Sequence, residues 1–301
     1  MLDGAMLIWF VLTGCSLAFA VWDSISNGVT SWVQRAAWIL VTAYTGPVGL
    51  FFYLLTCRRP FVGGHDRFTS TTWKQAVNSE MHCLAGDATG IILAAIVVSS
   101  LGLTNGWDAT IEYIAGFICG LFIFQALMML GMYQGNYLLA VRKTFFAETV
   151  SMNFVMAGMI PTMVVLAYHW PGSEIPTNPS FWFRMSLASL VGGFLAYPIN
   201  YWLVSRHLKH GCMTLPNADG PAEGMGHRSP EPAMVASGMA KHPHDGGEAH
   251  LHRKQTDDHE GHGSMEMTSL SLPVATAWVV FSFAVLLAAL IGTDFFVPIR
   301  F

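Results

Sequence analysis

The sequence has few charged residues, no excess of basic ones and few cysteines. Charged side chains make up 11% of its 301 residues, whereas a soluble globular protein carries about 25%. The 15 Lys and Arg are outnumbered by 19 Asp and Glu, which excludes the basic surface of a nucleic-acid-binding protein. The 5 cysteines contain no Cys-x-x-Cys pair, which excludes a disulfide-stapled secreted domain. The chain therefore lacks the polar surface that a soluble enzyme needs.

What the sequence has instead is a series of long apolar runs, and 53% of its residues are hydrophobic. Each run is close to the roughly 20 residues that a helix needs to cross a bilayer. The runs are apolar on all faces, which indicates helices rather than barrel strands. We expect an all-α polytopic integral membrane protein with seven transmembrane helices. The runs comprise residues 4–22, 36–57, 81–107, 114–141, 149–170, 185–205 and 273–293.

The composition divides the chain into four expected segments. Pro47, Pro161 and Pro198 fall inside apolar runs, where they predict helix kinks. No basic residue precedes the first run, so we expect it to be a retained helix rather than a signal peptide. The segments are two N-terminal transmembrane helices (1–60), a four-helix core membrane domain (70–213), a disordered His- and Met-rich loop (214–270) and a C-terminal transmembrane helix (271–301).

The basic residues predict how the helices cross the membrane. With seven helices, 12 of the 15 Lys and Arg fall on the side of the N-terminus. Basic residues concentrate on the cytoplasmic side of membrane proteins. We therefore expect a multi-pass protein of the bacterial inner (plasma) membrane, with the N-terminus and the His-rich loop in the cytoplasm and the C-terminus outside. This prediction depends on an odd number of helices.

The loop between the last two runs, about residues 206–272, contains nine of the 12 histidines. Neutral imidazoles at short intervals are ligands for Zn, Ni, Co or Cu. No zinc-finger spacing is present, so the pattern predicts loose, multi-site binding rather than a structural metal centre. The alternative is a solvated linker that happens to be rich in histidine. The candidate loop ligands are His242, His244, His250, His252, His259 and His262.

A second candidate site begins the third run. Glu80, Cys83 and Asp87 are three and four positions apart, which places them on one helical face. A carboxylate as deep as Asp87 is costly and usually faces the bundle interior, and with Cys83 it could bind a soft or borderline metal. His82 could share that ion only if the helix distorts near Gly86. The alternatives are that Glu80 caps the helix N-terminus and that Asp87 bonds a neighbouring helix.

The fifth run adds polar residues at the same predicted depth. Glu148, Met152 and Asn153 lie in this run, and Asn200 lies near the cytoplasmic end of the sixth. Apart from Gln125, the outer halves of the runs have no comparable cluster, so we expect a polar vestibule that faces the cytoplasm. Met152 also begins a stripe of methionines at helical spacing, which suits either Cu(I) conduction or simple packing. The proposed membrane ligands are His82, Cys83, Asp87, Glu148, Met152 and Asn153, with Glu80 and Asn200 in support.

Three segments resemble a bacterial membrane family catalogued as a domain of unknown function, number 4396. They are residues 79–90 (SEMHCLAGDATG), 146–153 (FAETVSMN) and 197–201 (YPINY), and the resemblance covers about residues 70–213. Some members of that family are labelled copper-related, so the resemblance implies a role connected with copper for this protein. A weaker likeness is to nickel/cobalt permeases, whose His-x4-Asp-His element is matched by His82 and Asp87. Ala88 stands where those permeases have the second His.

These features predict a transition-metal transporter or homeostasis protein for copper, nickel, cobalt or zinc, and not an enzyme. The alternative is a non-transporting membrane protein, either a metal chaperone or a structural scaffold. The expected partners are the lipid bilayer and a metal ion, without nucleic acid. Haem and retinal are not expected, because the spans lack paired histidines and the last one lacks a lysine. A bound nucleotide is not expected, because no Walker A sequence is present.

Overall fold

A computed structural model describes residues 2–27, 32–58, 68–211 and 270–301. These residues form helices, with no strand among them. Six helical segments are long and apolar enough to cross a membrane, which confirms the multi-pass helical class. They are α1 (Leu2–Ser26), α5 (Thr72–Val98), α6 with its continuation (Asn105–Met129), α8 (Tyr137–His169), α9 (Pro179–Ser205) and α10 (Leu272–Asp294).

The run at 36–57 does not form the predicted transmembrane helix. It contains α2 (Trp32–Thr45) and α3 (Pro47–Thr56), separated by Gly46. Gly46 has a φ of +59°, a left-handed conformation that favours glycine, and Pro47 begins the next helix without needing an amide donor. The two residues therefore reverse the chain instead of kinking one helix. Pro161 and Pro198, by contrast, lie inside the continuous helices α8 and α9.

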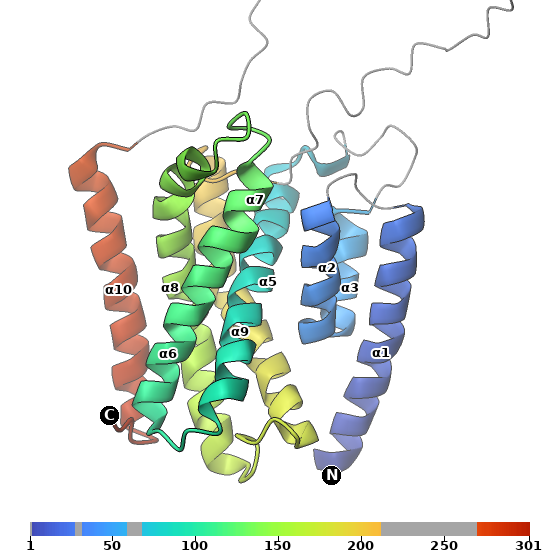
Figure 1. The fold of residues 1–301 in the computed structure, drawn as a ribbon, viewed down its shortest axis with the longest axis vertical. Coiled ribbons are helices and arrows are strands. Elements are labelled where there is room, and N and C mark those ends of the chain that lie inside the picture. Colours follow the sequence, from blue (N-terminus) through green and yellow to red (C-terminus); the bar gives the residue numbers. More distant parts are fainter. Residues whose placement is uncertain (1, 28–31, 59–67, 212–269) are drawn as a thin grey trace, which may run out of the picture. The chain divides into compact units, whose positions relative to one another are not determined.

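Side-chain contacts show that α2 and α3 form a helical hairpin. Gln34, near the start of α2, donates a hydrogen bond to the sulfur of Cys57 just after α3, at 3.4 Å. The rings of Trp38 and Tyr53 pack edge to face, with centroids 5.6 Å apart. Both helices occupy the upper part of the bundle in Figure 1. The described residues thus give six candidate spans rather than the predicted seven.

An ion pair fixes the open end of the hairpin to the end of α1. Arg58, after α3, lies 3.0 Å from the carboxylate of Asp23 near the end of α1. The hydroxyl of Tyr53 donates to the same carboxylate at 3.0 Å. The hairpin therefore returns to the side from which it started, and both chain ends lie at the lower end of the bundle (Figure 1). This corrects the predicted placement of the termini on opposite sides, which required an odd number of spans.

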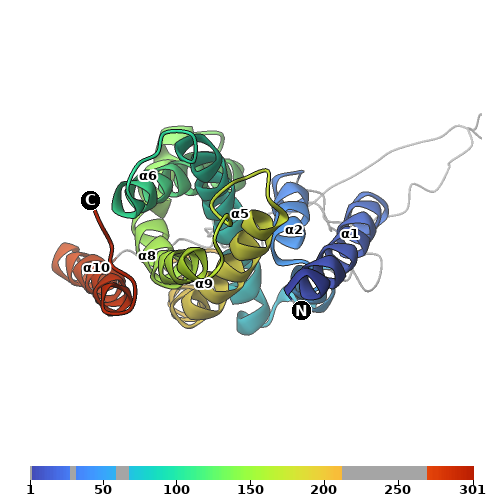
Figure 2. The ribbon, with the colours of Figure 1, turned by 90° about the horizontal axis from the view of Figure 1, so that it is seen from below.

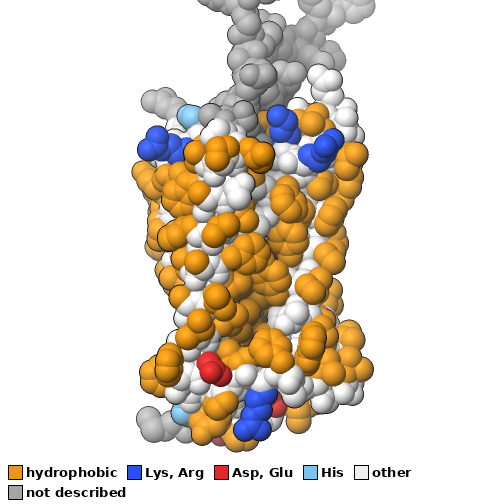
Figure 3. All heavy atoms as spheres, turned by 90° about the vertical axis from the view of Figure 1, so that its left-hand side faces the viewer, with side chains coloured by type: hydrophobic (Ala, Val, Ile, Leu, Met, Phe, Trp, Pro, Cys, Tyr) orange, Lys and Arg blue, Asp and Glu red, His pale blue; other side chains and the backbone are white. Residues whose placement is uncertain are grey.

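The centre of the bundle is built from α5, α6, α8 and α9. Figure 2 shows these helices grouped between α10 on one side and α1 on the other. In the most apolar window of α5, 78% of the residues are buried, against 11% in the corresponding windows of α1 and α10. The outer two helices therefore present most of their surface to lipid. Figure 3 shows the result on one face, a broad hydrophobic belt with charged side chains near its two ends.

Glycines allow the central helices to approach closely. Gly86 and Gly90 of α5 are four positions apart, as are Gly116 and Gly120 on the facing segment. A Cβ built on Gly86 would lie 2.7 Å from the Cα of Gly120, and one on Gly90 would lie 2.7 Å from the Cα of Gly116. Small residues spaced by four are the usual means of close helix contact in membranes. This contact places α5 directly against the end of α6 and the segment that follows it.

Candidate functional site

A buried polar cluster lies where α5 meets α8, with Cys83 at its centre. The thiol of Cys83 donates to Oε2 of Glu148 at 2.9 Å, although the two residues come from different helices. The ammonium group of Lys209 lies 2.9 Å from the same sulfur. All three side chains are buried. The predicted proximity of Cys83 and Glu148 is therefore found, together with a cation that was not predicted to be there.

Lys209 reaches the cluster because the chain folds back after α9. The helix ends at Ser205, and His207 takes the left-handed φ of +56°. The amides of Leu208 and Lys209 then both donate to the carbonyl of Leu203 at 2.9 and 3.3 Å. This turn carries Lys209 back into the bundle, where only 2% of its surface is exposed.

Asn200 holds the ammonium group of Lys209 from the other side. Its Oδ1 accepts from Lys209 Nζ at 2.6 Å and from the hydroxyl of Ser151 at 3.0 Å. Burial alone would lower the pKa of Lys209, but the neighbouring Cys83, Glu148 and Asp87 outweigh it, and the net shift is upward. Lys209 is therefore a charged, hydrogen-bonded group at neutral pH. Asn200, which was predicted to support a metal site, is thus a hydrogen-bond partner of this lysine.

Asp87 lies beside Glu148 at a π-helical segment. This segment, η1 (Cys119–Gln125), continues α6 and leads into the short α7 (Ala126–Met129). A Cβ on Gly120 of η1 would contact Oδ1 of Asp87 and would lie 2.7 Å from Oε1 of Glu148. No donor group in the described part of the chain reaches either oxygen of Asp87 or Oε1 of Glu148. Two acids so placed need a proton or another cation between them, and π-helical turns are frequent at functional sites.

The remaining predicted ligands lie outside this cluster. Asn153 accepts a hydrogen bond from Tyr113 at 2.8 Å and donates one to Ser282 at 2.9 Å, so it links α8 to α6 and α10. Met152 is buried in the hydrophobic core, where a Cβ on Gly116 would lie 2.8 Å from its terminal methyl group. These contacts favour packing over conduction for Met152.

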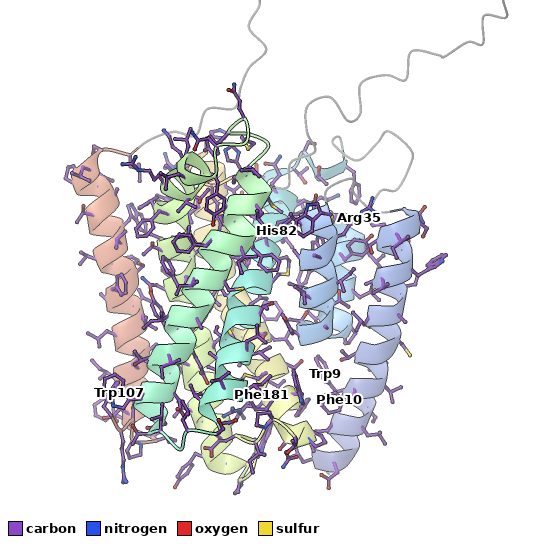
Figure 4. The ribbon with its side chains drawn as sticks, viewed as in Figure 1. Trp9, Phe10, Arg35, His82, Trp107 and Phe181 are labelled. Atoms are coloured by element: carbon purple, nitrogen blue, oxygen red, sulfur yellow. The ribbon has the colours of Figure 1, made fainter. Side chains whose placement is uncertain are left out.

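His82 and Glu80 also differ from prediction. His82 is buried in the upper part of α5, and neither of its ring nitrogens has a hydrogen-bond partner in the described chain (Figure 4). Because α5 is α-helical without interruption at Gly86, His82 and Asp87 remain on different faces. Glu80 does not cap a helix, since α5 begins at Thr72, more than two turns earlier.

No group of three His, Cys, Asp or Glu side chains among the described residues converges as metal ligands do. Cys83, Asp87 and Glu148 come together, but Lys209 occupies the position of a counter-cation. The six candidate histidines of the loop, from His242 to His262, lie outside the described residues. The structure therefore contains one sulfur donor and several oxygen donors, and the positive charge beside them comes from Lys209 of the same chain.

Sequence reasoning missed four buried charged residues, of which Asp23 pairs with Arg58 at the end of α1. Lys209 was counted as a loop charge, since only the backbone turn after α9 returns it to the bundle. Glu112 of α6 and Arg184 of α9 are each 7% exposed and lie toward the other end of the bundle. The expectation that, apart from Gln125, the outer halves of the runs have no comparable polar cluster did not take these two residues into account. Glu112 was missed because the fourth apolar run was taken to start after it.

The fold and this site define a polytopic helical membrane protein with an internal Lys–Cys–carboxyl network. Residues 72–209 match the model of the family described as Domain of unknown function (DUF4396). The match begins with α5 and ends at Lys209, so it contains every member of the network. No curated protein and no solved structure matches the chain. The likeness to nickel/cobalt permeases is not supported by these comparisons.

Proposed function

We propose that this protein transports a transition-metal ion across the membrane or holds it there, and that Cys83, Asp87 and Glu148 receive the ion. The observation that carries the proposal is the contact of Lys209 with Cys83 beside the two carboxyl groups. Ionisable groups inside a membrane domain are costly and usually mark an ion pathway. A site that already accommodates one cation among sulfur and oxygen atoms is suited to exchange it for another.

The exchange of a divalent ion conserves charge within the cluster, whereas Cu(I) conserves it only if one carboxyl group keeps or takes up a proton. A metal ion that enters displaces the ammonium group of Lys209, which withdraws with its positive charge. Cys83 loses its proton as the sulfur–metal bond forms, because a thiolate is the metal ligand and binding releases protons. The carboxyl oxygens of Asp87 and Glu148 that lack a donor are the oxygen ligands. Thiolate sulfur favours Cu(I) and Zn over hard cations such as Mg.

The distribution of basic residues supports access from the cytoplasm. The end of the bundle where α5 begins is the end near Arg35 in Figure 4, whereas the end with Trp107 carries few basic residues. Because basic residues concentrate on the cytoplasmic side, we infer that both termini are outside and the His-rich loop is cytoplasmic. The basic residues described at the inferred cytoplasmic end are Arg35, Arg58, Lys74, Arg142, Lys143, Arg206 and Lys209, against Arg184 and Arg300 at the other.

One observation favours a second candidate, a membrane protein that does not transport metal. Cys83, Lys209, Asn200 and Ser151 already form a connected hydrogen-bond network. Such a network could serve only to hold the segment after α9 against α5. In that case the network is permanent, and no ion displaces Lys209.

Metal uptake into proteoliposomes separates the two candidates. The purified full-length protein is reconstituted and tested with Cu(I), Zn, Ni and Co ions. We expect accumulation of one of these by the wild type, and a loss of roughly tenfold or more in a Cys83→Ser, Asp87→Asn double variant. Cys15→Ser is the matched control, because Cys15 is exposed on α1 and should leave uptake unchanged. Uptake that is absent in the wild type, or equal in the double variant, contradicts the transport proposal.

A further inference from the structure

A second polar group is buried away from the Cys83 cluster, in a pocket between α3, α5 and α9. The pocket has a volume of about 270 Å³. Phe52 of α3 lines it on one side and Trp73 of α5 on another, while Phe194 and Tyr197 of α9 complete the aromatic wall. Of these, Trp73 and Phe194 are exposed at the bundle surface, 37% and 63% respectively. The pocket therefore reaches the outer surface of the bundle.

Glu80 is the one acidic group in this pocket. Its side chain is 1% exposed, and neither carboxylate oxygen has a hydrogen-bond partner in the described chain. Gly193 of α9 faces it, and a Cβ there would lie 3.6 Å from Oε1 of Glu80. Gly193 has no side chain, so the carboxylate of Glu80 lies directly behind the pocket wall that the two residues share. A buried carboxylate without partners is costly, so the pocket lacks a group that would satisfy Glu80.

The shape and lining of the pocket indicate what that group is. A lipid chain would fill the apolar wall but would leave Glu80 without a partner. A small inorganic cation would find one carboxylate and no further acidic ligands among the lining residues. An organic cation matches both features, because its charge pairs with the carboxylate while its apolar groups contact the aromatic rings. None of the pocket residues belongs to the Cys83 cluster.

We propose that the Glu80 pocket binds a lipophilic organic cation, such as a quaternary or protonated tertiary amine, that enters from the lipid side between α5 and α9. The cation lies with its charge against the Glu80 carboxylate and its substituents against Phe52, Trp73 and Tyr197. This site shares no residue with the Cys83 cluster, although the charge of Lys209 also acts on Glu80. The protein thus carries two cation sites of different chemistry on the same helix.

Equilibrium dialysis with radiolabelled benzyltrimethylammonium tests this site on the full-length protein in a non-ionic detergent. We expect saturable binding to the wild type and a loss of affinity of roughly tenfold or more in Glu80→Gln, since a buried charge contact contributes on that order. Glu112→Gln is the matched control, because Glu112 is a buried carboxyl outside the pocket. It should bind the probe as the wild type does.

Gly193→Ala provides a second variant in case Glu80→Gln fails to fold. Its methyl group would lie 3.4 Å from Cδ2 of Leu84 and 3.6 Å from Glu80, which are ordinary contacts, so the fold should accept it. The methyl group fills space beside the carboxylate, and we expect weaker binding at an unchanged melting temperature. The proposal is overturned if the wild type shows no saturable binding, if both pocket variants bind normally, or if Glu112→Gln loses as much affinity as Glu80→Gln.

Discussion

The ammonium nitrogen of Lys209 lies 2.9 Å from the sulfur of Cys83, although the two residues are 126 positions apart. This contact joins the segment after α9, where the matched domain ends, to α5, where it begins. A buried lysine requires such partners, because an unpaired ammonium group inside a protein is costly. The contact therefore links the two ends of the matched segment and places a positive charge in its buried site.

Replacement of Lys209 by Met should destabilise the protein. The variant removes the hydrogen bonds that Lys209 donates to Cys83 and Asn200 and the positive charge near Glu148 and Asp87. The loss of a hydrogen bond made by a buried charged group costs about 2 kcal/mol. We expect a clear drop in the thermal unfolding temperature of the detergent-purified protein. The drop should be smaller at acidic pH, where the carboxyl groups take up a proton in place of the lysine. Lys143→Met is the control, because Lys143 is exposed.

The pH dependence of the wild type follows from the same lysine. Its pKa in the folded protein is raised above the ordinary value of 10.5 by Cys83 and the two carboxyl groups, which outweigh burial. A group with a raised pKa stabilises the fold fully below its ordinary pKa and loses that contribution as the pH rises through the folded value. The Lys209 contribution should therefore be constant between about pH 6 and 9. An equal melting temperature for Lys209→Met and the wild type throughout this range contradicts the assigned role.

Gly120 should be among the least replaceable positions of the domain. In Gly120→Ala the new methyl group would contact Asp87 and Glu148, two side chains that are themselves packed against other helices. Overpacking of this kind costs about 1–3 kcal/mol, so the melting temperature should fall. Gly14→Ala is the matched control, since a Cβ at Gly14 meets nothing within 4 Å. A fall in Gly14→Ala as large as in Gly120→Ala would show that the effect is not local.

The parts of the site that the sequence predicts are those fixed by helical spacing and depth. Cys83 and Asp87 lie one turn apart on a single helix, and Glu148 lies at the same depth on another, so their approach needs only that the two helices pack. Lys209 was not predictable in this way. Its place depends on the left-handed His207 and on a turn that no periodicity encodes.

The hairpin α2–α3 was missed for a related reason. An apolar run of this length is compatible with one helix, and the reversal at Gly46 and Pro47 changes neither its length nor its composition. The contact between Gln34 and Cys57 distinguishes the two folds. One span more or fewer changes which side of the membrane the basic residues assign to the N-terminus, so this turn also changes the inferred location of the N-terminus.

The His-rich loop should account for loosely bound metal in the purified protein. Deletion of residues 214–268 removes the six candidate histidines from His242 to His262. We expect elemental analysis after incubation with Zn or Ni to show a large loss of bound metal in this variant. Cys83→Ser keeps these histidines and should keep that metal. Equal metal content in the deletion variant and the wild type contradicts metal binding by the loop.

The two termini should lie on the same side of the membrane, opposite the His-rich loop. Six spanning helices and a hairpin that returns to its own side require this arrangement, whereas seven helices would separate the termini. Short epitope tags at the N-terminus, inside the loop and at the C-terminus can be probed with antibody in right-side-out membrane vesicles. We expect the N- and C-terminal tags to be accessible without detergent and the loop tag only after permeabilisation. If α2 and α3 instead formed one crossing helix, the N- and C-terminal tags would differ in accessibility, and Asp23 and Arg58 could not pair across the membrane.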